Sequence, residues 1–435
     1  MSPLAAALLD QEARSLQTRL ARVRPFALIE PMVPAAALLP AAQSALERYL
    51  VTGRRELNGL VATFQDWLRG AHASVNGDEA QRRFTFLRLK FNATLTQFDL
   101  FNDVITQRSE HENGVWLSGL DAVAADALSL PDDYYRMPPV ICYLDRGPGA
   151  AIRRSRTRLP GGGENPVAVI RVPRERMIGS GIASSLIHEV GHQGAALLDL
   201  VNSLRPALQE KQKTDPAQRQ AWQMWERWIS EIVADFWSVA RVGIVSTLGL
   251  IGVVSLPRVF VFRLNGDDPH PIPWIRVMLS SAMGDAMYPH PQWKRLSAAW
   301  HEFYPSATLA PDTRALLDAL LRSMPDFVAL LLRHQPPSLR GRTLPQVLEV
   351  AARQPARLAQ LYARWSEHPR EMYQARPSLV FAVLGQARSD GQVSPEDENV
   401  LLAKLLTHWA LRSTLDSSFL CAGLGARSPA VSEQL

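Results

Sequence analysis

The residues best suited to chemistry fall in one short stretch, Leu186 to His192, which reads LIHEVGH. On an α-helix, positions i and i+4 lie on the same face, so His188 and His192 can direct both imidazoles at one metal ion. Glu189 stands about 100° round the helix from His188. Its carboxylate would then lie beside the ion, where it can take a proton from a water molecule on the metal. The stretch predicts the helix of a zinc hydrolase.

The residues around this stretch support a helix. Apolar and small side chains recur at helical period on the face opposite the two histidines: Leu186, Ile187, Val190, Gly194, Leu197 and Leu198. We therefore expect one face to pack against the protein and the other to face a cleft.

A second stretch, Trp228 to Trp237, offers a third metal ligand. Zinc in a hydrolase usually takes three protein ligands and leaves the fourth position to water. Glu231 and Asp235 are again four residues apart, on a segment whose apolar positions follow a helical period: Trp222, Trp225, Ile229, Ile232, Val233 and Phe236. Two carboxylates on a buried helix are satisfied if one binds zinc and the other accepts the second N–H of a ligand histidine.

Together the two stretches resemble the gluzincin group of metallopeptidases, in which His-Glu-x-x-His is followed on a later helix by Glu-x-x-x-Asp. The resemblance covers little more than these two helices. It implies one Zn²⁺ held by His188, His192 and Glu231, with Glu189 as the general base. Asp235 would orient His188 from the second coordination shell.

The same resemblance implies an oxyanion-stabilising side chain after the third ligand. His270 and Arg276 are the candidates, and His270 is taken as the catalytic one. A loop histidine and an arginine paired with a surface carboxylate are the alternatives. Metzincins and peptide deformylases fit less well, although the second family would make Cys142 a possible ligand.

These residues predict a zinc-dependent metallopeptidase acting on peptide or protein substrates. The alternative is a helical interaction or scaffold protein with a structural or degenerate metal site. Glu189 separates the two, because a structural site has no use for a carboxylate beside the metal.

Composition limits the other possibilities. The chain has 435 residues, 47% of them hydrophobic, and a formal charge of +5 that is scattered rather than clustered. We therefore expect two or three domains and no nucleic-acid partner. Two distant cysteines imply no disulfide framework. The segment from Met1 to Leu9 has no basic flank and does not read as a secretory signal. The sequence predicts a cytoplasmic protein.

The predicted fold class is α+β, predominantly α-helical: a zincin-like catalytic core with a small β-sheet, flanked by helical regions. Residues 1–128 form the N-terminal helical region, 129–304 the catalytic domain and 305–435 the C-terminal helical region. Strands are expected at Val140–Leu144 and Val167–Val172. By the resemblance, Val167–Val172 is the edge strand that would pair with an extended substrate. The apolar stretch Val242–Leu256 is too short to span a bilayer and predicts a buried helix, so membrane association is not expected.

Overall fold

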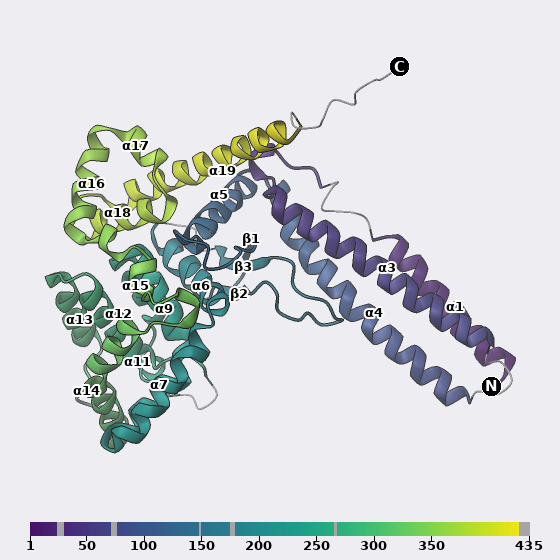
Figure 1. Ribbon diagram of the computed structural model, residues 1–435, viewed down its shortest axis with the longest axis horizontal. Helices are drawn as coiled ribbons and strands as arrows, with labels where there is room; N and C mark the ends of the chain where they lie inside the picture. Colours follow the sequence, from purple (N-terminus) through teal and green to yellow (C-terminus); the bar gives the residue numbers. More distant parts are fainter. Residues whose placement is uncertain (24–29, 71–75, 148, 175–178, 265–267, 426–435) are drawn as a thin grey trace.

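The computed structural model describes residues 1–23, 30–70, 76–147, 149–174, 179–264 and 268–425. These residues are mostly helical and include one three-stranded sheet, which confirms the predicted predominance of helix with a small sheet. An arm of three long helices projects from a larger helical body, and the sheet lies where the arm and body meet (Figure 1).

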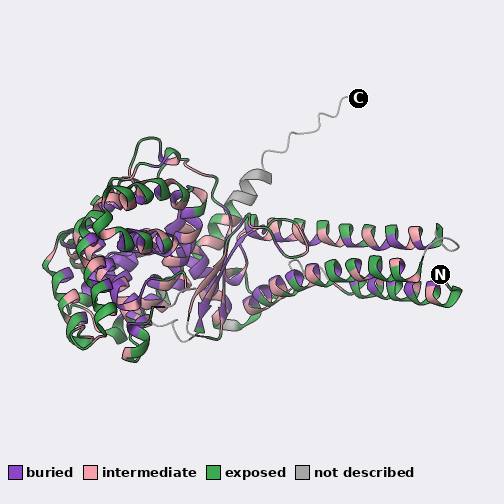
Figure 2. Ribbon diagram, turned by 90° about the horizontal axis from the view of Figure 1, so that it is seen from below, coloured by how far each residue is buried: buried purple, intermediate pink, exposed green. Residues whose placement is uncertain are grey.

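The arm consists of α1 (Pro3–Ala21), α3 (Pro40–Gly70) and α4 (Gly77–Thr106). Ser2 and Asn76 begin α1 and α4 by accepting hydrogen bonds from backbone N–H groups of the first turn. Figure 2 shows the buried positions on facing sides of the arm helices. These positions include Leu57, Phe64, Phe84 and Phe91, which belong to one hydrophobic cluster, so the arm has a core of its own.

The sheet contains β1 (Val140–Asp145), β2 (Ala151–Arg153) and β3 (Ala168–Pro173). The strand order is β1-β3-β2, with β1 parallel and β2 antiparallel to β3. The two predicted strands are confirmed, but the prediction that Val167–Val172 forms the edge is wrong. Five of the six residues of β3 are buried, as expected for a strand covered on both faces. The two edge strands are β1 and β2, and β2 was not predicted from the sequence.

The two faces of the sheet pack against different parts of the chain. Ile141 and Val169 share a cluster with the base of the arm. Cys142 and Ile170 point to the other face and join the main core of the body. The sheet therefore connects the arm to the body.

The helices of the body surround this main core. In chain order they are α5 (His111–Leu128), α6 (Gly181–Leu197), α7 (Leu200–Thr214), α8 (Arg219–Arg227), α9 (Ile229–Val242), α10 (Ile244–Val254), α11 (Arg258–Val261), α12 (Pro273–Met287), α13 (Pro291–Phe303), α14 (Pro311–Arg333), α15 (Leu344–Val347), α16 (Pro355–Glu367), α17 (Pro369–Gln374), α18 (Pro377–Ser389) and α19 (Pro395–Gly425). Short 3-10 turns lie at Pro34–Ala36, Gln107–Ser109, Pro216–Gln218, Pro337–Leu339 and Val350–Arg353. The core is continuous across residues 128/129 and 304/305, the two predicted domain boundaries.

The apolar stretch Val242–Leu256 forms the last residue of α9 and all of α10. Gly243, with φ of 60°, separates the two helices in a backbone conformation that favours glycine. Ile244, Val245 and Leu250 of α10 are buried in the main core, so the predicted packed helix is present. Within the described ranges, no helix is both long and apolar enough to cross a membrane.

Candidate metal centre

Close packing of α6 against α9 brings the two predicted motifs together. Gly191 and Gly194 of α6 face α9. A Cβ atom on Gly191 would lie 2.9 Å from the backbone of Ala234, and one on Gly194 would lie 2.6 Å from the Trp237 ring. Only a residue without a side chain allows the two backbones to approach this closely. The glycine of the HEVGH stretch therefore sets the distance between the histidines of α6 and the carboxylates of α9.

His188, His192 and Glu231 form one group, whose possible ligand atoms all lie within 4.8 Å of one another. The Nε2 atom of His188 is 3.3 Å from Oε2 of Glu231, and Nε2 of His192 is 3.3 Å from Oε1 of the same carboxylate. Zinc binds such atoms at about 2.0 to 2.1 Å in a tetrahedron, whose ligand atoms are then roughly 3.3 Å apart. The donor types and their spacing fit a zinc ion.

Asp235 lies directly behind His188. Its Oδ1 atom is 2.8 Å from Nδ1 of His188, on the opposite side of the ring from Nε2. This contact leaves Nε2, which Nη2 of Arg276 approaches at 3.4 Å, as the nitrogen that faces Glu231 and could bind a metal, as in the carboxylate-histidine pairs that hold zinc ligands. The sequence-based placement of Asp235 next to His188 matches the observed position.

Arg276 of α12 completes this buried charge network. Its Nε and Nη2 atoms donate to the two oxygens of Asp235 at 2.7 and 2.9 Å, and Nη2 lies 3.4 Å from Oε2 of Glu231. The arginine side chain is only 11% exposed, so its partner is this interior carboxylate rather than one on the surface. Arg276 neutralises charge that would otherwise be costly to bury.

These contacts shift the pKa values of His188, Asp235 and Glu231. Burial alone would lower the pKa of His188, but the Asp235 carboxylate and the hydrogen bonds to Asp235 and Glu231 raise it to about 9. Burial would raise the pKa of Asp235, yet Arg276 and His188 lower it to about 2. Burial likewise opposes ionisation of Glu231, and the hydrogen bonds from His188 and His192 hold its pKa far below the ordinary value. Both carboxylates are therefore ionised at neutral pH, as metal binding requires.

Glu189 occupies a different environment from Glu231. Its side chain lines a cavity of about 140 Å³ beside His188. Within the ranges that the structure describes, its carboxylate has no hydrogen bond or ion pair, although it lies in the field of Arg276. The carboxylate is therefore open to a molecule that enters the cavity.

His270 also reaches this site, from the segment before α12. Its Nε2 atom is 3.3 Å from Oε2 of Glu231, and the side chain is 50% exposed. Asp268 accepts from the backbone N–H of His270 at 3.0 Å, and its Oδ1 atom lies 2.6 Å from Nδ1 of the ring. Sequence reasoning proposed His270 and missed Asp268; the available signal was an acidic residue two positions before the histidine.

The cavity lies beside the segment that leads into β2. Gly149 and Ala150, which lead into β2, form part of its wall. Other lining residues come from α6, α9, α10 and α12 and the segment before α12: Ser184, Ser185, His188, Glu189, Asp235, Ser246, Leu250, Val253, His270 and Arg276. The volume is below the roughly 300 Å³ of small ligand pockets. It can hold only part of a larger molecule.

Cys142 is not part of this centre. It is fully buried in β1, and its backbone N–H donates to Asp121 at 2.7 Å. Burial raises the pKa of its thiol well above the ordinary value. The alternative in which Cys142 serves as a metal ligand is excluded by this position.

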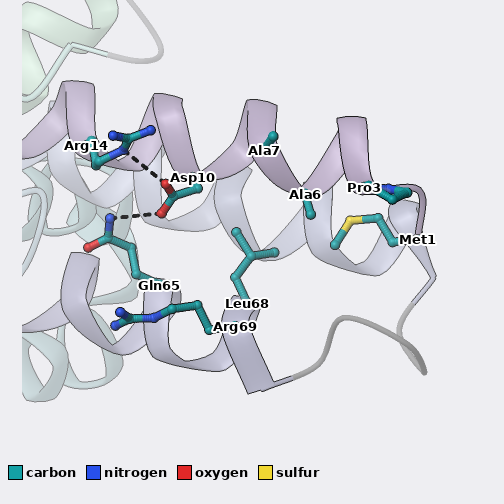
Figure 3. A pocket seen from close by; sticks show the side chains of 9 residues that line it. All are labelled: Met1, Pro3, Ala6, Ala7, Asp10, Arg14, Gln65, Leu68 and Arg69. Carbon is teal, nitrogen blue, oxygen red and sulfur yellow. Dashed lines mark hydrogen bonds and ion pairs between the residues drawn. The ribbon is translucent and has the colours of Figure 1, made fainter.

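A larger hollow, of about 690 Å³, lies on the arm between α1 and α3 (Figure 3). Its single carboxylate, Asp10, is engaged by Arg14 at 3.0 Å and Gln65 at 3.3 Å. Most of the other lining side chains are apolar or small. The hollow offers no group comparable to those of the metal centre.

Comparisons with known proteins add no assignment: no family model, curated protein or solved structure matches the chain.

Proposed function

We propose that the protein is a zinc-dependent peptidase that hydrolyses peptide bonds of peptide or protein substrates. One observation carries the proposal: among the described residues, the carboxylate of Glu189 is left without a partner in a cavity beside His188, His192 and Glu231. A structural metal site needs ligands that enclose the ion, whereas a catalytic one needs an open position with a base beside it.

In this proposal His188, His192 and Glu231 hold the zinc, and Asp235 and Arg276 fix His188 and Glu231 in place. Zinc, when bound, would polarise the scissile carbonyl and lower the pKa of the attacking water. Glu189 accepts a proton from that water and later delivers it to the leaving amine. His270, oriented by Asp268, lies on the exposed side of Glu231 and donates to the oxygen that gains negative charge.

The proposal is tested by measuring zinc content and peptide hydrolysis on the same preparation of the protein. The purified protein is expected to contain one zinc per chain and to cleave a peptide library, to lose cleavage in a strong chelator, and to regain it with added zinc. His188→Ala, His192→Ala and Glu231→Ala should each reduce zinc content sharply.

The alternative function is a helical scaffold whose metal holds α6 and α9 together. It predicts bound zinc, no hydrolysis of any peptide in the library, and loss of thermal stability when the metal is removed. Full zinc content in Glu231→Ala would contradict the proposed third ligand.

A further inference from the structure

A second hollow, of about 590 Å³, lies at the end of the sheet where β2 ends and β1 begins. The start of α3, the segment before β1 and the residues after β2 form its walls. Its volume is within the range of about 300 to 1,000 Å³ that is usual for ligand sites. We refer to it as the arginine hollow, after Arg48, Arg136 and Arg156 in its lining.

The charge of the arginine hollow is uncompensated. Arg48, Arg136 and Arg156 line it, and none has a carboxylate within ion-pair distance in the described part of the chain. No aspartate or glutamate lines the hollow. The only side-chain contact among the three is a hydrogen bond from Arg156 to the backbone carbonyl of Arg136, at 3.2 Å. Three guanidinium groups around one concave surface produce a positive potential that attracts anions.

Ser155 supplies a second, independent sign of a ligand. Its side chain lines the arginine hollow, is only 5% exposed, and its hydroxyl oxygen has no hydrogen-bond partner among the described residues. A buried hydroxyl normally has a partner, because leaving it unsatisfied costs about 1 to 3 kcal/mol. The hydroxyl oxygen has almost no accessible surface, so a carboxylate in the hollow would pair with the guanidinium groups directly and would accept from this hydroxyl only after the Ser155 side chain turns towards it.

β2 connects the arginine hollow to the metal centre. Ala150, just before β2, lines the cavity with Glu189, and Arg156, just after it, lines the hollow. These residues are six positions apart, and because Ser155 and Arg156 lie in a turn after the strand, they are separated by less than the roughly 20 Å of a fully extended chain. The backbone N–H of Ser155 also donates to Gln193, the residue after His192, at 2.9 Å. One peptide lying along β2 could therefore reach both places.

The outer edge of β2 is available for such a peptide. β2 pairs with β3 on one side, and no strand of the described residues pairs with its other side. Antiparallel pairing is slightly the more stable arrangement. It would place the N-terminal part of the bound peptide at the end of β2, next to the arginine hollow.

We propose that the arginine hollow selects substrates that carry acidic residues on the N-terminal side of the cleaved bond, beyond the residues that pair with β2. This inference rests on the proposed peptidase function and names the substrate class for the same site. It assigns binding to Arg48, Arg136, Arg156 and the Ser155 hydroxyl, which take no part in the chemical step.

The test uses three peptide libraries on the full chain. Each has a central block of six randomised residues, preceded by Asp-Glu-Glu in the first library, followed by Asp-Glu-Glu in the second, and flanked by Gln-Gln-Gln in the third. The first is expected to show a kcat/KM about tenfold above the third, the size of effect that a few charged contacts give. In a variant with Arg48→Gln, Arg136→Gln and Arg156→Gln, the ratio of kcat/KM for the first library to kcat/KM for the third should fall towards one. Equal kcat/KM for the three libraries, a preference for the second, or an unchanged ratio in the variant would overturn the inference while leaving the peptidase function intact.

A matched control removes the same number of charges elsewhere. Arg295, Arg322 and Arg357 lie on α13, α14 and α16, away from the arginine hollow, and their replacement by Gln should leave the ratio as in the original protein. Binding is measured separately, by fluorescence anisotropy of a labelled acidic peptide with Glu189→Gln protein. Binding that depends on the three arginines, without cleavage by the original protein, would contradict the peptidase function and support the anion site. Binding that the arginine variant retains would overturn the anion site itself.

Discussion

Asp235 lies 2.8 Å from the Nδ1 atom of His188, on the opposite side of the imidazole from the metal-binding Nε2. The same carboxylate accepts two hydrogen bonds from Arg276. One side chain thus fixes the orientation of a metal ligand and the position of the nearest buried cation.

The first prediction concerns Asp235→Ala. Loss of the partner of a ligand histidine typically weakens metal affinity by about ten- to a hundredfold rather than abolishing binding. Arg276 would also lose its main carboxylate partner in the interior, so the variant should be less stable. Competition with a calibrated chelator measures the affinity, and unchanged affinity would show that His188 is held by other contacts. Asp285→Asn, further along the same helix as Arg276, provides a control for the loss of a negative charge from α12.

The second prediction concerns the contact between α6 and α9. Gly191→Ala would place a methyl group 2.9 Å from the backbone of Ala234. Overpacking of this kind costs about 1 to 3 kcal/mol of stability. Because α9 must move, Glu231 should shift from the histidines and zinc affinity should fall. Gly59→Ala on α3 is the control: no atom lies within 4 Å of its Cβ position, so the higher helix propensity of alanine should leave stability equal or greater. A Gly191→Ala protein with unaltered zinc affinity would show that the helix spacing is not critical.

Much of this centre could be predicted from the sequence, because helical spacing alone puts His188 above His192 and Glu231 in line with Asp235. Two carboxylates on a buried helix also required partners, which the structure provides. The edge strand could not be predicted in the same way. β2 has three residues and no hydrophobic pattern, whereas β3 has the apolar sequence of a strand and lies in the centre of the sheet.

Other features depend on contacts between distant parts of the chain. Arg276 is 41 residues from Asp235 in sequence, and no local spacing relates them. The placement of α5 in the body, although it follows directly on the arm helices, depends on packing against α19 near the other end of the chain. Helical periodicity shows which residues are buried but not which helix covers them.

A third prediction concerns pH. Asp126 of α5 lies 2.8 Å from Nε of Arg376 and accepts from the backbone N–H of Ser378 at 2.8 Å. Burial would raise the pKa of Asp126, but Arg376 and Ser378 lower it below the ordinary value of about 3.9. A lowered pKa in the folded state contributes stability that is fully present above the unfolded pKa and is lost as pH falls through the folded one.

The Asp126→Asn protein should therefore be less stable than the original at pH 7, by about 1 to 3 kcal/mol. Since the substituted amide side chain does not titrate, the difference in free energy of unfolding should shrink below about pH 4. Urea denaturation of both proteins at pH 7 and at pH 3 measures this difference in free energy of unfolding. Asp66→Asn, which breaks an exposed pair with Arg69, should change stability by less than about 1 kcal/mol at either pH. A difference for Asp126→Asn that stays constant with pH would mean that the charge of the carboxylate contributes nothing.

The last prediction concerns Glu189, because it separates catalysis from structure. Glu189→Gln keeps the size of the side chain and leaves His188, His192 and Glu231 unchanged, but it removes the basic oxygen that must receive the water proton. Since Glu189 has no hydrogen bond or ion pair to lose among the described residues, zinc content and thermal stability should be nearly those of the original protein. Loss of general-base assistance typically costs a factor of about 10² to 10⁴ in rate, so peptide cleavage should nearly vanish while substrate binding persists. Glu302→Gln, on an exposed position of α13, should retain full activity. Zinc content, thermal unfolding and cleavage are measured on the same preparations, and cleavage at the original rate by zinc-loaded Glu189→Gln would exclude the mechanism proposed here.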